Sequence, residues 1–181
     1  MIIYAITDPI TLNFNNLEDD LEYFSLTSKM IVYRDKLNKN YTRDAKTFLI
    51  EAKKHSFDKI LLHSDYELAH KLKATGVHLK STQLNDIAKA KELELFVIIS
   101  THTIEESLEA ENLGADMVTF SPIFETPDKG KPKGIETLNH LSSLLTIPLI
   151  ALGGIITQHQ IELCEKNGAK GFASIRWFLK N

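Results

Sequence analysis

The stretch FVIISTHTIEESLEAENLGADMVTFSP, from Phe96 to Pro122, contains a complete strand–helix–strand unit and decides the fold class. The apolar, β-branched run from Phe96 to Thr101 is typical of a buried strand, and Met117 to Pro122 repeats that pattern. Between the two runs, an S/T-x-x-E capping box begins at Thr103 and predicts the start of a helix, while Gly114 predicts its end. A helix between two apolar strands favours a parallel βαβ unit.

Runs of the same kind recur at regular intervals on both sides of this unit. The expected strands are Ile2 to Asp8, Met30 to Lys36, Lys59 to Ser64, Gly76 to Lys80, Phe96 to Thr101, Met117 to Pro122, Pro148 to Gly154 and Phe172 to Ile175. Most of the segments between them carry apolar residues at helical spacing. Such units can close into a compact (β/α)8 TIM barrel, which is the α/β fold that we expect. A doubly wound open sheet is the structural alternative.

The expected barrel is a single domain that spans residues 1–181 and has an incomplete last unit. Only six residues, 176–181, follow the last strand, so the eighth helix is missing or cut to one turn. This leaves part of the flank of the barrel uncovered. We expect that flank to meet another subunit in a homo-oligomer.

The amino-acid composition argues against nucleic acid and membranes as binding partners of this chain. Lys and Arg number 21 against 24 Asp and Glu, a formal net charge of -3, so the chain lacks the positive field that draws proteins to nucleic acid or anionic membranes. The single cysteine, Cys164, excludes a disulfide within the chain and a cysteine-based zinc motif. The N-terminus has no basic region ahead of its apolar run, and no segment approaches about 18 continuous apolar residues. We therefore expect a cytoplasmic protein with a small-molecule partner.

In a TIM barrel the loops after the strands carry the function, so the residues that end the strands are the informative ones. Several cations end strands in this chain, and Gly153-Gly154 follows the seventh strand. Because glycine has no Cβ, its N–H group can approach an anion closely. Ile175 and Arg176 end the eighth strand, and the arginine adds a forked donor to the same place. The sequence thus predicts a phosphate site; the alternative is that the glycines only form a tight turn and Arg176 is a surface charge.

The longest loop, Ile123 to Gly134, is rich in lysine and glycine, and we expect it to close over a ligand. Lys129 or Lys131 would then meet a negative group of that ligand. The alternative is an ordinary solvated loop.

Three histidines lie in or after expected strands, where a pKa near neutrality suits proton transfer. We take His63 as the acid–base candidate. We expect His78 in the internal layers of the barrel, while His102 precedes a helix cap, so a structural hydrogen bond is favoured for both. The carboxylates at the strand ends show no metal-ligand spacing, so we expect no metal site.

Five segments carry a family resemblance. They are YAITDP (4–9), YRDK (33–36), GVHL (76–79), STHTIEESLEAENLGADMVTFSPIFET (100–126) and IPLIALGGI (147–155). In this order they resemble the thiamine phosphate synthase and TenI family along nearly the whole chain. The resemblance implies that Arg34 and Lys36 contact a pyrimidine diphosphate, together with Ser100, Thr126 and a lid lysine. It also implies that the glycine pair after the seventh strand holds a thiazole phosphate.

Synthases of this family use magnesium to offset the charge of the diphosphate leaving group, and the resemblance implies two aspartates for that metal. One would stand where this chain has Ser64 and the other where it has Gln83. Asp65 or Asp86 would substitute only if the chain shifted by a position or more. We therefore expect no cofactor, with magnesium needed only if the chain is a synthase.

Loss of the metal ligands beside a retained thiazole-phosphate segment is the pattern of the TenI branch, which also shows Phe-Glu-Thr, as at residues 124–126. The leading expectation is therefore a thiazole tautomerase of thiamine biosynthesis, which moves a proton between the thiazole ring and its exocyclic carbon. His63 and Lys129 are its expected catalytic residues, because Pro122 stands where that branch has its histidine. A thiamine phosphate synthase is the alternative, and a non-catalytic ligand-binding or regulatory relative is a second alternative.

Overall fold

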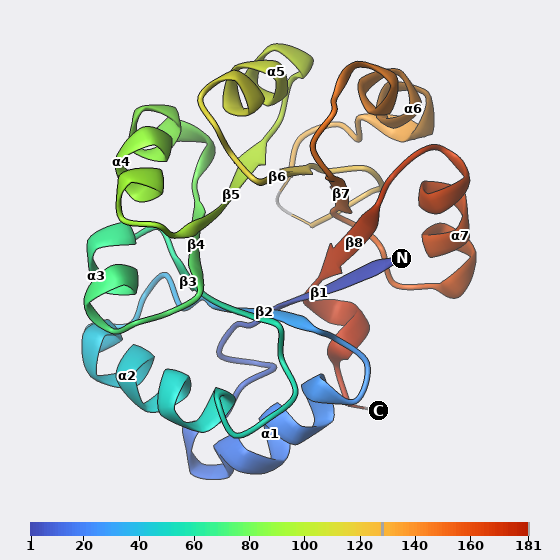
Figure 1. Cartoon of the computed structure of the whole chain (residues 1–181). Helices are drawn as coiled ribbons and strands as arrows, with labels where there is room; N and C mark the ends of the chain where they lie inside the picture. The colour runs from blue at the N-terminus through green and yellow to red at the C-terminus, as the bar shows by residue number, and fades with distance from the viewer. Residues whose placement is uncertain (128, 181) are drawn as a thin grey trace.

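The computed structural model describes residues 1–127 and 129–180 and forms a closed barrel (Figure 1). Each strand pairs in parallel with the next along the chain, and the last strand pairs with the first. The strands are β1 (Ile2–Ile6), β2 (Met30–Tyr33), β3 (Lys59–His63), β4 (Gly76–Leu79), β5 (Phe96–Thr101), β6 (Met117–Phe120), β7 (Leu149–Leu152) and β8 (Gly171–Ser174). The expected TIM barrel is confirmed, and the open-sheet alternative is wrong because the sheet closes on itself.

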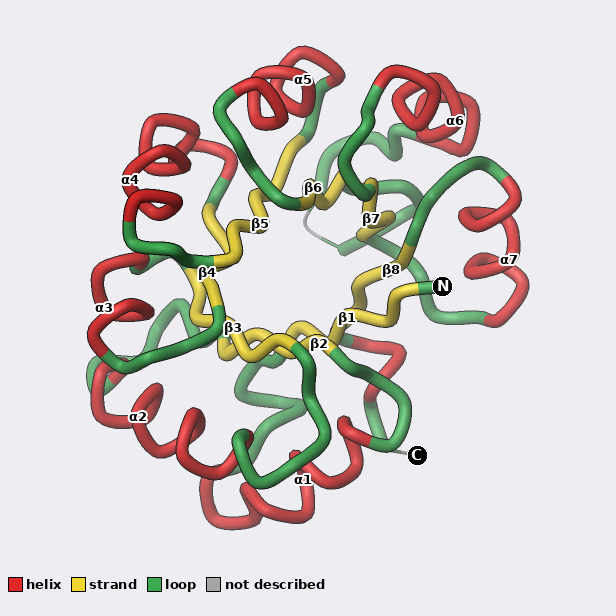
Figure 2. Tube along the Cα trace, in the orientation of Figure 1, coloured by secondary structure: helices red, strands yellow, loops and turns green. Residues whose placement is uncertain are grey.

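Helices surround the barrel, as the view along its axis shows (Figure 2). The α-helices are α1 (Leu17–Ser25), α2 (Tyr41–Ala52), α3 (Tyr66–Lys71), α4 (Ile87–Glu92), α5 (Ile104–Asn112), α6 (Gly134–Leu144) and α7 (Gln158–Lys166). The 3-10 helices are η1 (Phe14–Asn16), η2 (Ser81–Asp86) and η3 (Arg176–Phe178). No helix within the described part of the chain is long and apolar enough to cross a membrane.

The predicted ends of α5 are confirmed by its hydrogen bonds. Thr103 Oγ1 accepts a hydrogen bond from the Glu106 N–H at 3.1 Å, which satisfies one of the free donors at the helix start. Gly114, just beyond the helix, has a φ of 95°, a conformation that a residue with a Cβ adopts only at a cost. The cap and the glycine therefore set the length of the helix between β5 and β6.

The core has two layers because side chains alternate along each strand. One set fills the inside of the barrel: Tyr4, Ile6, Met30, Val32, Leu61, Ile98, Ile150 and Ala173. The residues between them, such as Ala5, Ile31 and Leu62, pack in the outer cluster, which includes residues of the helices. This alternation determines which residues face inward where the strands end.

The eighth helix is cut to one turn, as expected, and two aromatic side chains of that turn close the flank. The Phe178 ring lies 5.2 Å from the ring of Phe24 on α1, and the Trp177 ring lies 5.4 Å from Phe172 on β8. Lys180 then forms an ion pair with Asp20 of α1 at 2.8 Å. The flank is therefore better covered than the missing helix led us to expect; the contact with another subunit stays a prediction.

Candidate functional site

Four inward-facing positions define the mouth of the barrel at the carboxyl ends of the strands. Arg34 and His63 follow Val32 and Leu61 by two residues, so alternation directs them to the inside. His78 is the register partner of His63 on the next strand, and the two imidazole rings lie 6.1 Å apart. Ser100 lies two residues after the inward Ile98 on β5. The strands thus bring residues far apart in sequence to one opening.

A hydrogen-bonded chain crosses the inside of the barrel just below this opening. The Tyr4 hydroxyl lies 2.9 Å from His78 Nδ1, and His78 Nε2 lies 2.9 Å from Ser100 Oγ. Burial lowers the pKa of His78 to about 3, so its imidazole is neutral near pH 7, with one nitrogen that donates and one that accepts. Both ring nitrogens of His78 have partners, so these hydrogen bonds fix the position of the Ser100 side chain. The expectation that His78 belongs to the internal layers is confirmed.

His63 is held through its backbone by a residue of α2. The Tyr41 hydroxyl accepts a hydrogen bond from the His63 N–H at 3.1 Å and donates to the Tyr33 carbonyl at 2.9 Å, which joins the ends of β2 and β3. Burial first, and then the positive charges of Arg34, Lys36 and Lys80, lower the pKa of His63 to about 4. The imidazole is therefore neutral near pH 7, with a pKa below the near-neutral range that we expected from the sequence.

Four cations from three loops meet at the mouth. Arg34 and Lys36 follow β2, Lys80 follows β4, and Lys129 lies in the long loop after β6. The pKa of Lys36 is lowered by Arg34 first, then by partial burial, and then by Lys129 and Lys80. Charges depress one another in this way only when they are near each other, so the loops concentrate positive charge over the barrel. Such a site favours an anion with several negative charges.

The carboxylates beside these cations cap turns and helices. Asp8 Oδ1 accepts hydrogen bonds from the backbone N–H groups of residues 10 and 11 at 3.0 and 2.9 Å. Asp35 Oδ1 accepts one from Leu37 at 3.2 Å, and Asp65 caps α3 by accepting one from Leu68 at 2.8 Å. Asp8 and Asp35 also raise the pKa of Arg34, while its burial lowers it. The acidic groups thus hold the loops in place and offset part of the charge of Arg34.

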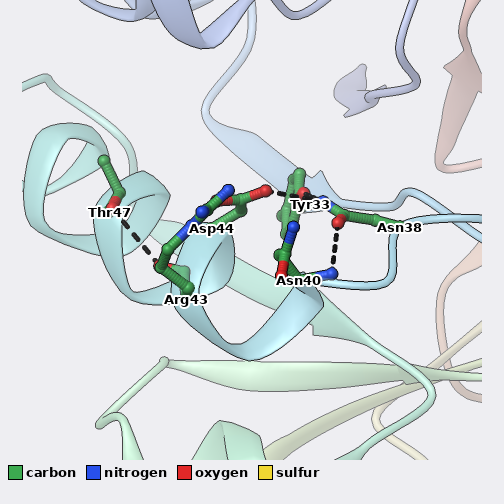
Figure 3. A network of polar contacts seen from close by, with 6 residues as sticks. All are labelled: Tyr33, Asn38, Asn40, Arg43, Asp44 and Thr47. Carbon is green, nitrogen blue, oxygen red and sulfur yellow. Dashed lines mark hydrogen bonds and ion pairs between the residues drawn. The ribbon is translucent and has the colours of Figure 1, made fainter.

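A polar network holds the loop that carries Arg34 and Lys36 against α2 (Figure 3). The Asn38 amide donates to the Tyr33 hydroxyl at 2.9 Å and to Asp44 at 2.8 Å, and Asp44 forms an ion pair with Arg43 at 2.8 Å. A cavity of about 730 Å³ lies beside this network. Its lining residues are Asp8, Pro9, Ile10, Leu12, Asn13, Phe14, Tyr33, Asp35, Leu37, Asn38, Lys39 and Asp44. Three of these residues are aspartates and only one is a lysine, so the cavity does not favour an anion. We therefore assign phosphate binding to the cationic mouth.

The glycine pair after β7 is packed against the loop after β6. Gly153 and Gly154 have φ values of 96° and 71°. A Cβ on Gly153 would lie 2.7 Å from Pro122 Cα, and one on Gly154 would lie 2.5 Å from the Glu125 carbonyl oxygen. The turn itself therefore requires glycine at both positions, as the alternative to phosphate binding proposed. The hydrogen bonds of the described residues also leave both glycine N–H groups without an acceptor, so they can meet an anion.

The remaining predicted ligand residues lie in the segments that follow β6 and β8. Thr126 Oγ1 donates to the Phe124 carbonyl at 2.9 Å and would be 3.3 Å from a Cβ on Gly153. Ile175 packs against the inner cluster, while Arg176 is exposed and forms no ion pair within residues 1–127 and 129–180. Thr126 lies in the loop after β6, and Ile175 and Arg176 follow β8; their contact with a ligand stays a prediction.

His102 has the structural role that the sequence favoured. The ring nitrogen Nδ1 of His102 lies 3.0 Å from the Ser121 carbonyl oxygen. The backbone N–H of His102 donates a hydrogen bond to Glu106 Oε2 at 2.6 Å. These bonds join the ends of β5 and β6 to α5. Thr119, the register partner of Ser100, is fully buried, and its hydroxyl has no partner among the described residues.

Tyr4, Lys80 and Thr119 also face the inside of the barrel, and no sequence motif assigns them a role. Alternation from the inward-facing Ile6, His78 and Met117 would have placed all three on the inside of the barrel. The hydrogen bond between Tyr4 and His78, which are separated by 74 positions, has no local sequence signal.

The donor set at the mouth does not fit magnesium. In the parts of the chain that the structure describes, no three His, Cys, Asp or Glu side chains lie close enough to hold a metal ion. Magnesium prefers carboxylate and phosphate oxygens, whereas the groups that converge here are ammonium and guanidinium groups. The side chains that converge at the mouth are therefore suited to contact with an anion.

Comparisons with known proteins agree with the fold and the sequence segments. The family model described as thiamine monophosphate synthase matches residues 3–178. The putative thiamine-phosphate synthase 2 of Aquifex aeolicus is 34% identical over 183 residues, which cover 98% of this chain and 97% of that protein. The thiamine-phosphate synthase of Dictyoglomus turgidum is 31% identical over 184 residues, covering 96% and 80%.

A solved structure gives the same result. The thiamine phosphate pyrophosphorylase from Pyrococcus furiosus superposes with a TM-score of 0.80 at 25% identity, covering 96% of this chain and 85% of that one. The names of these relatives favour the synthase, which was the alternative expectation from the sequence, over the tautomerase, which was the leading one. On the family match over nearly all its length and on its closed barrel, this chain belongs to the thiamine monophosphate synthase and TenI family.

Proposed function

We propose that this protein is a transferase that joins a pyrimidine diphosphate to a thiazole phosphate and forms thiamine phosphate. The convergence of Arg34, Lys36, Lys80 and Lys129 on one mouth is the observation that carries this proposal. A diphosphate and a phosphate are the most highly charged parts of the two substrates, and a mouth with four cations suits both. The names of the relatives support the same reaction.

The cations act on the leaving group. As the bond between the pyrimidine methylene carbon and the diphosphate oxygen breaks, negative charge grows on the diphosphate. Arg34, Lys36 and Lys129 are placed to stabilise that charge before the reaction begins. The thiazole nitrogen attacks the methylene carbon, the new carbon–nitrogen bond forms, and diphosphate leaves. No proton transfer is needed for this step, so the low pKa of His63 does not impede it.

The opposite side of the mouth receives the thiazole phosphate. The free N–H groups of Gly153 and Gly154 would hold its phosphate, with Arg176 as a forked donor and Ile175 against the ring. Ser100, which His78 fixes in position at 2.9 Å, would orient the pyrimidine. Magnesium would supply further charge to the diphosphate in related synthases, but the donor set here does not fit it, and no step in this chain depends on it.

A thiazole tautomerase is a second candidate, and one observation favours it. His63 faces the mouth as a neutral imidazole, and its side chain forms no hydrogen bond with any residue in the described ranges. An anion bound to the neighbouring cations would raise the pKa of His63 toward the range of an acid–base catalyst. The lid residue Lys129 would then hold the phosphate.

The test is turnover of purified protein in two parallel assays. One contains pyrimidine diphosphate and thiazole phosphate, and the other contains the thiazole carboxylate tautomer. We expect thiamine phosphate in the first assay and a loss of at least about 100-fold in Arg34→Gln, since Arg34 stabilises developing charge. Lys46→Gln, on the exposed side of α2, is the matched control. Tautomer conversion alone, abolished by His63→Gln, would replace the synthase with the second candidate, and silence in both would contradict an enzymatic role.

A further inference from the structure

We propose that the ammonium group of Lys80 supplies the positive charge that a divalent metal supplies in related synthases, so that diphosphate binds here without any metal. This inference rests on the proposed function for the identity of the substrate. Its argument comes from the segment between β3 and η2, where the family resemblance led us to expect two aspartates.

An amide occupies the place of the second expected carboxylate and ties the two loops together. Gln83 Nε2 donates to the Ser64 carbonyl at 2.9 Å and to Asp86 Oδ2 at 3.1 Å. Gln83 Oε1 accepts a hydrogen bond from the Lys80 N–H at 3.1 Å. The amide thus uses both of its N–H donors and one lone pair of Oε1 in this link, and it carries no charge in the place of the expected carboxylate. This link fixes the two loops and sets the backbone of Lys80.

The neighbouring carboxylates have other partners. Asp65 caps α3, with its Oδ1 2.8 Å from the Leu68 nitrogen. Asp86 receives Gln83 on one oxygen and the Lys89 ammonium on the other, at 3.2 Å. Binding a metal through Asp86 would compete with the bonds on both of its oxygens, and binding one through Asp65 Oδ1 would compete with the helix cap. Neither residue takes the place of the expected aspartates.

Lys80 stands where the charge is needed. It directly follows β4 and is two residues beyond His78, so alternation directs it to the mouth. Its charge acts on groups from two other strands, because it contributes to the lowered pKa of Lys36 and of His63. It forms no ion pair with a described residue, although Lys89 on the next helix does. A diphosphate at the mouth would relieve the repulsion among the four cations.

The test measures binding of inorganic diphosphate by calorimetry, first with EDTA and then with added magnesium. We expect the wild-type protein to bind diphosphate in EDTA, and magnesium to leave the affinity unchanged or to weaken it by binding diphosphate in solution. Lys80→Gln should weaken binding at least about tenfold, while Lys80→Arg, which keeps the charge, should retain it. Lys71→Gln, an exposed lysine at the end of α3, is the matched control. Unchanged urea midpoints would verify that the variants are folded.

Each outcome decides one question. Binding that appears only with magnesium, or equal binding by Lys80→Gln and wild type, would overturn the role of Lys80. Diphosphate binding in EDTA without thiamine phosphate formation would leave the role of Lys80 standing and remove the proposed function. Thiamine phosphate formation that EDTA abolishes would support the proposed function and overturn the role of Lys80.

Discussion

Acidification should destabilise this protein before its carboxylates titrate, because two of its histidines are held neutral. The folded-state pKa of His63 is about 4 and that of His78 is about 3, against an ordinary value of 6.5. Below pH 6.5 the unfolded chain takes up protons at these positions and the folded protein does not. The stability associated with their neutral state is therefore fully present above that pH and is lost as the pH falls toward the folded values.

The magnitude follows from the two pKa values of each histidine. Between pH 7.5 and 5.5, each loses about 1.3 kcal/mol of unfolding free energy, and together they lose about 2.7 kcal/mol. With a urea m value of about 2 kcal/mol/M, the unfolding midpoint should fall by about 1.3 M over this range. His63→Gln removes one of the two groups, so its midpoint should fall by only about half as much.

The assay is urea unfolding followed by circular dichroism at both pH values, for wild type, His63→Gln and His140→Gln. His140 lies on the exposed side of α6, so its variant should show the wild-type dependence. The reasoning fails if His63→Gln loses as much stability on acidification as the wild type. That result would mean that Arg34, Lys36, Lys80 and burial do not hold His63 in its neutral form.

Three further predictions test the packing and the site. Gly154→Ala should lower the unfolding free energy by more than about 1 kcal/mol, since its positive φ and its close contacts exclude a Cβ, whereas Gly130→Ala, which has open space around it, should leave the urea midpoint unchanged. Phe178→Ala should cost about 3 kcal/mol in the same assay, and a loss below about 1 kcal/mol would mean that η3 does not close the flank. The double variant Ser64→Asp with Gln83→Asp should gain a calorimetric magnesium signal that the wild type lacks, because it restores two carboxylates to the mouth; an unchanged signal would contradict our account of the missing metal site.

The fold could be predicted almost completely from local patterns, because each βαβ unit carries its own signals. The errors lie at the strand ends. The run from Ile2 to Asp8 reads as one strand, but β1 stops at Ile6 because Asp8 turns its carboxylate onto the following backbone. The closure of the flank by Trp177 and Phe178 depends on rings from α1 and β8, and the sequence does not reveal such contacts.

The site could be predicted only as a set of strand ends. Arg34 and Ser100 came from strand ends and the family segments, and His63 came from its place at the end of a strand. The pKa of His63 depends on burial and on cations from two loops, and the fixed position of Ser100 depends on Tyr4, which is far away in the sequence. The amide link made by Gln83 also required coordinates, because a glutamine three residues after Lys80 has many possible partners.

The turn that replaces the eighth helix also gives this protein a built-in optical probe. Trp177 is the only tryptophan of the chain, so all indole fluorescence comes from one place. Its ring packs between the rings of Phe172 and Phe178. Its backbone N–H donates a hydrogen bond to Ser174 Oγ at 3.1 Å, and Trp177 directly follows Arg176 in the sequence. We therefore expect a phosphate ligand that contacts Arg176 to change the emission of this single indole, so that binding can be followed in unlabelled protein.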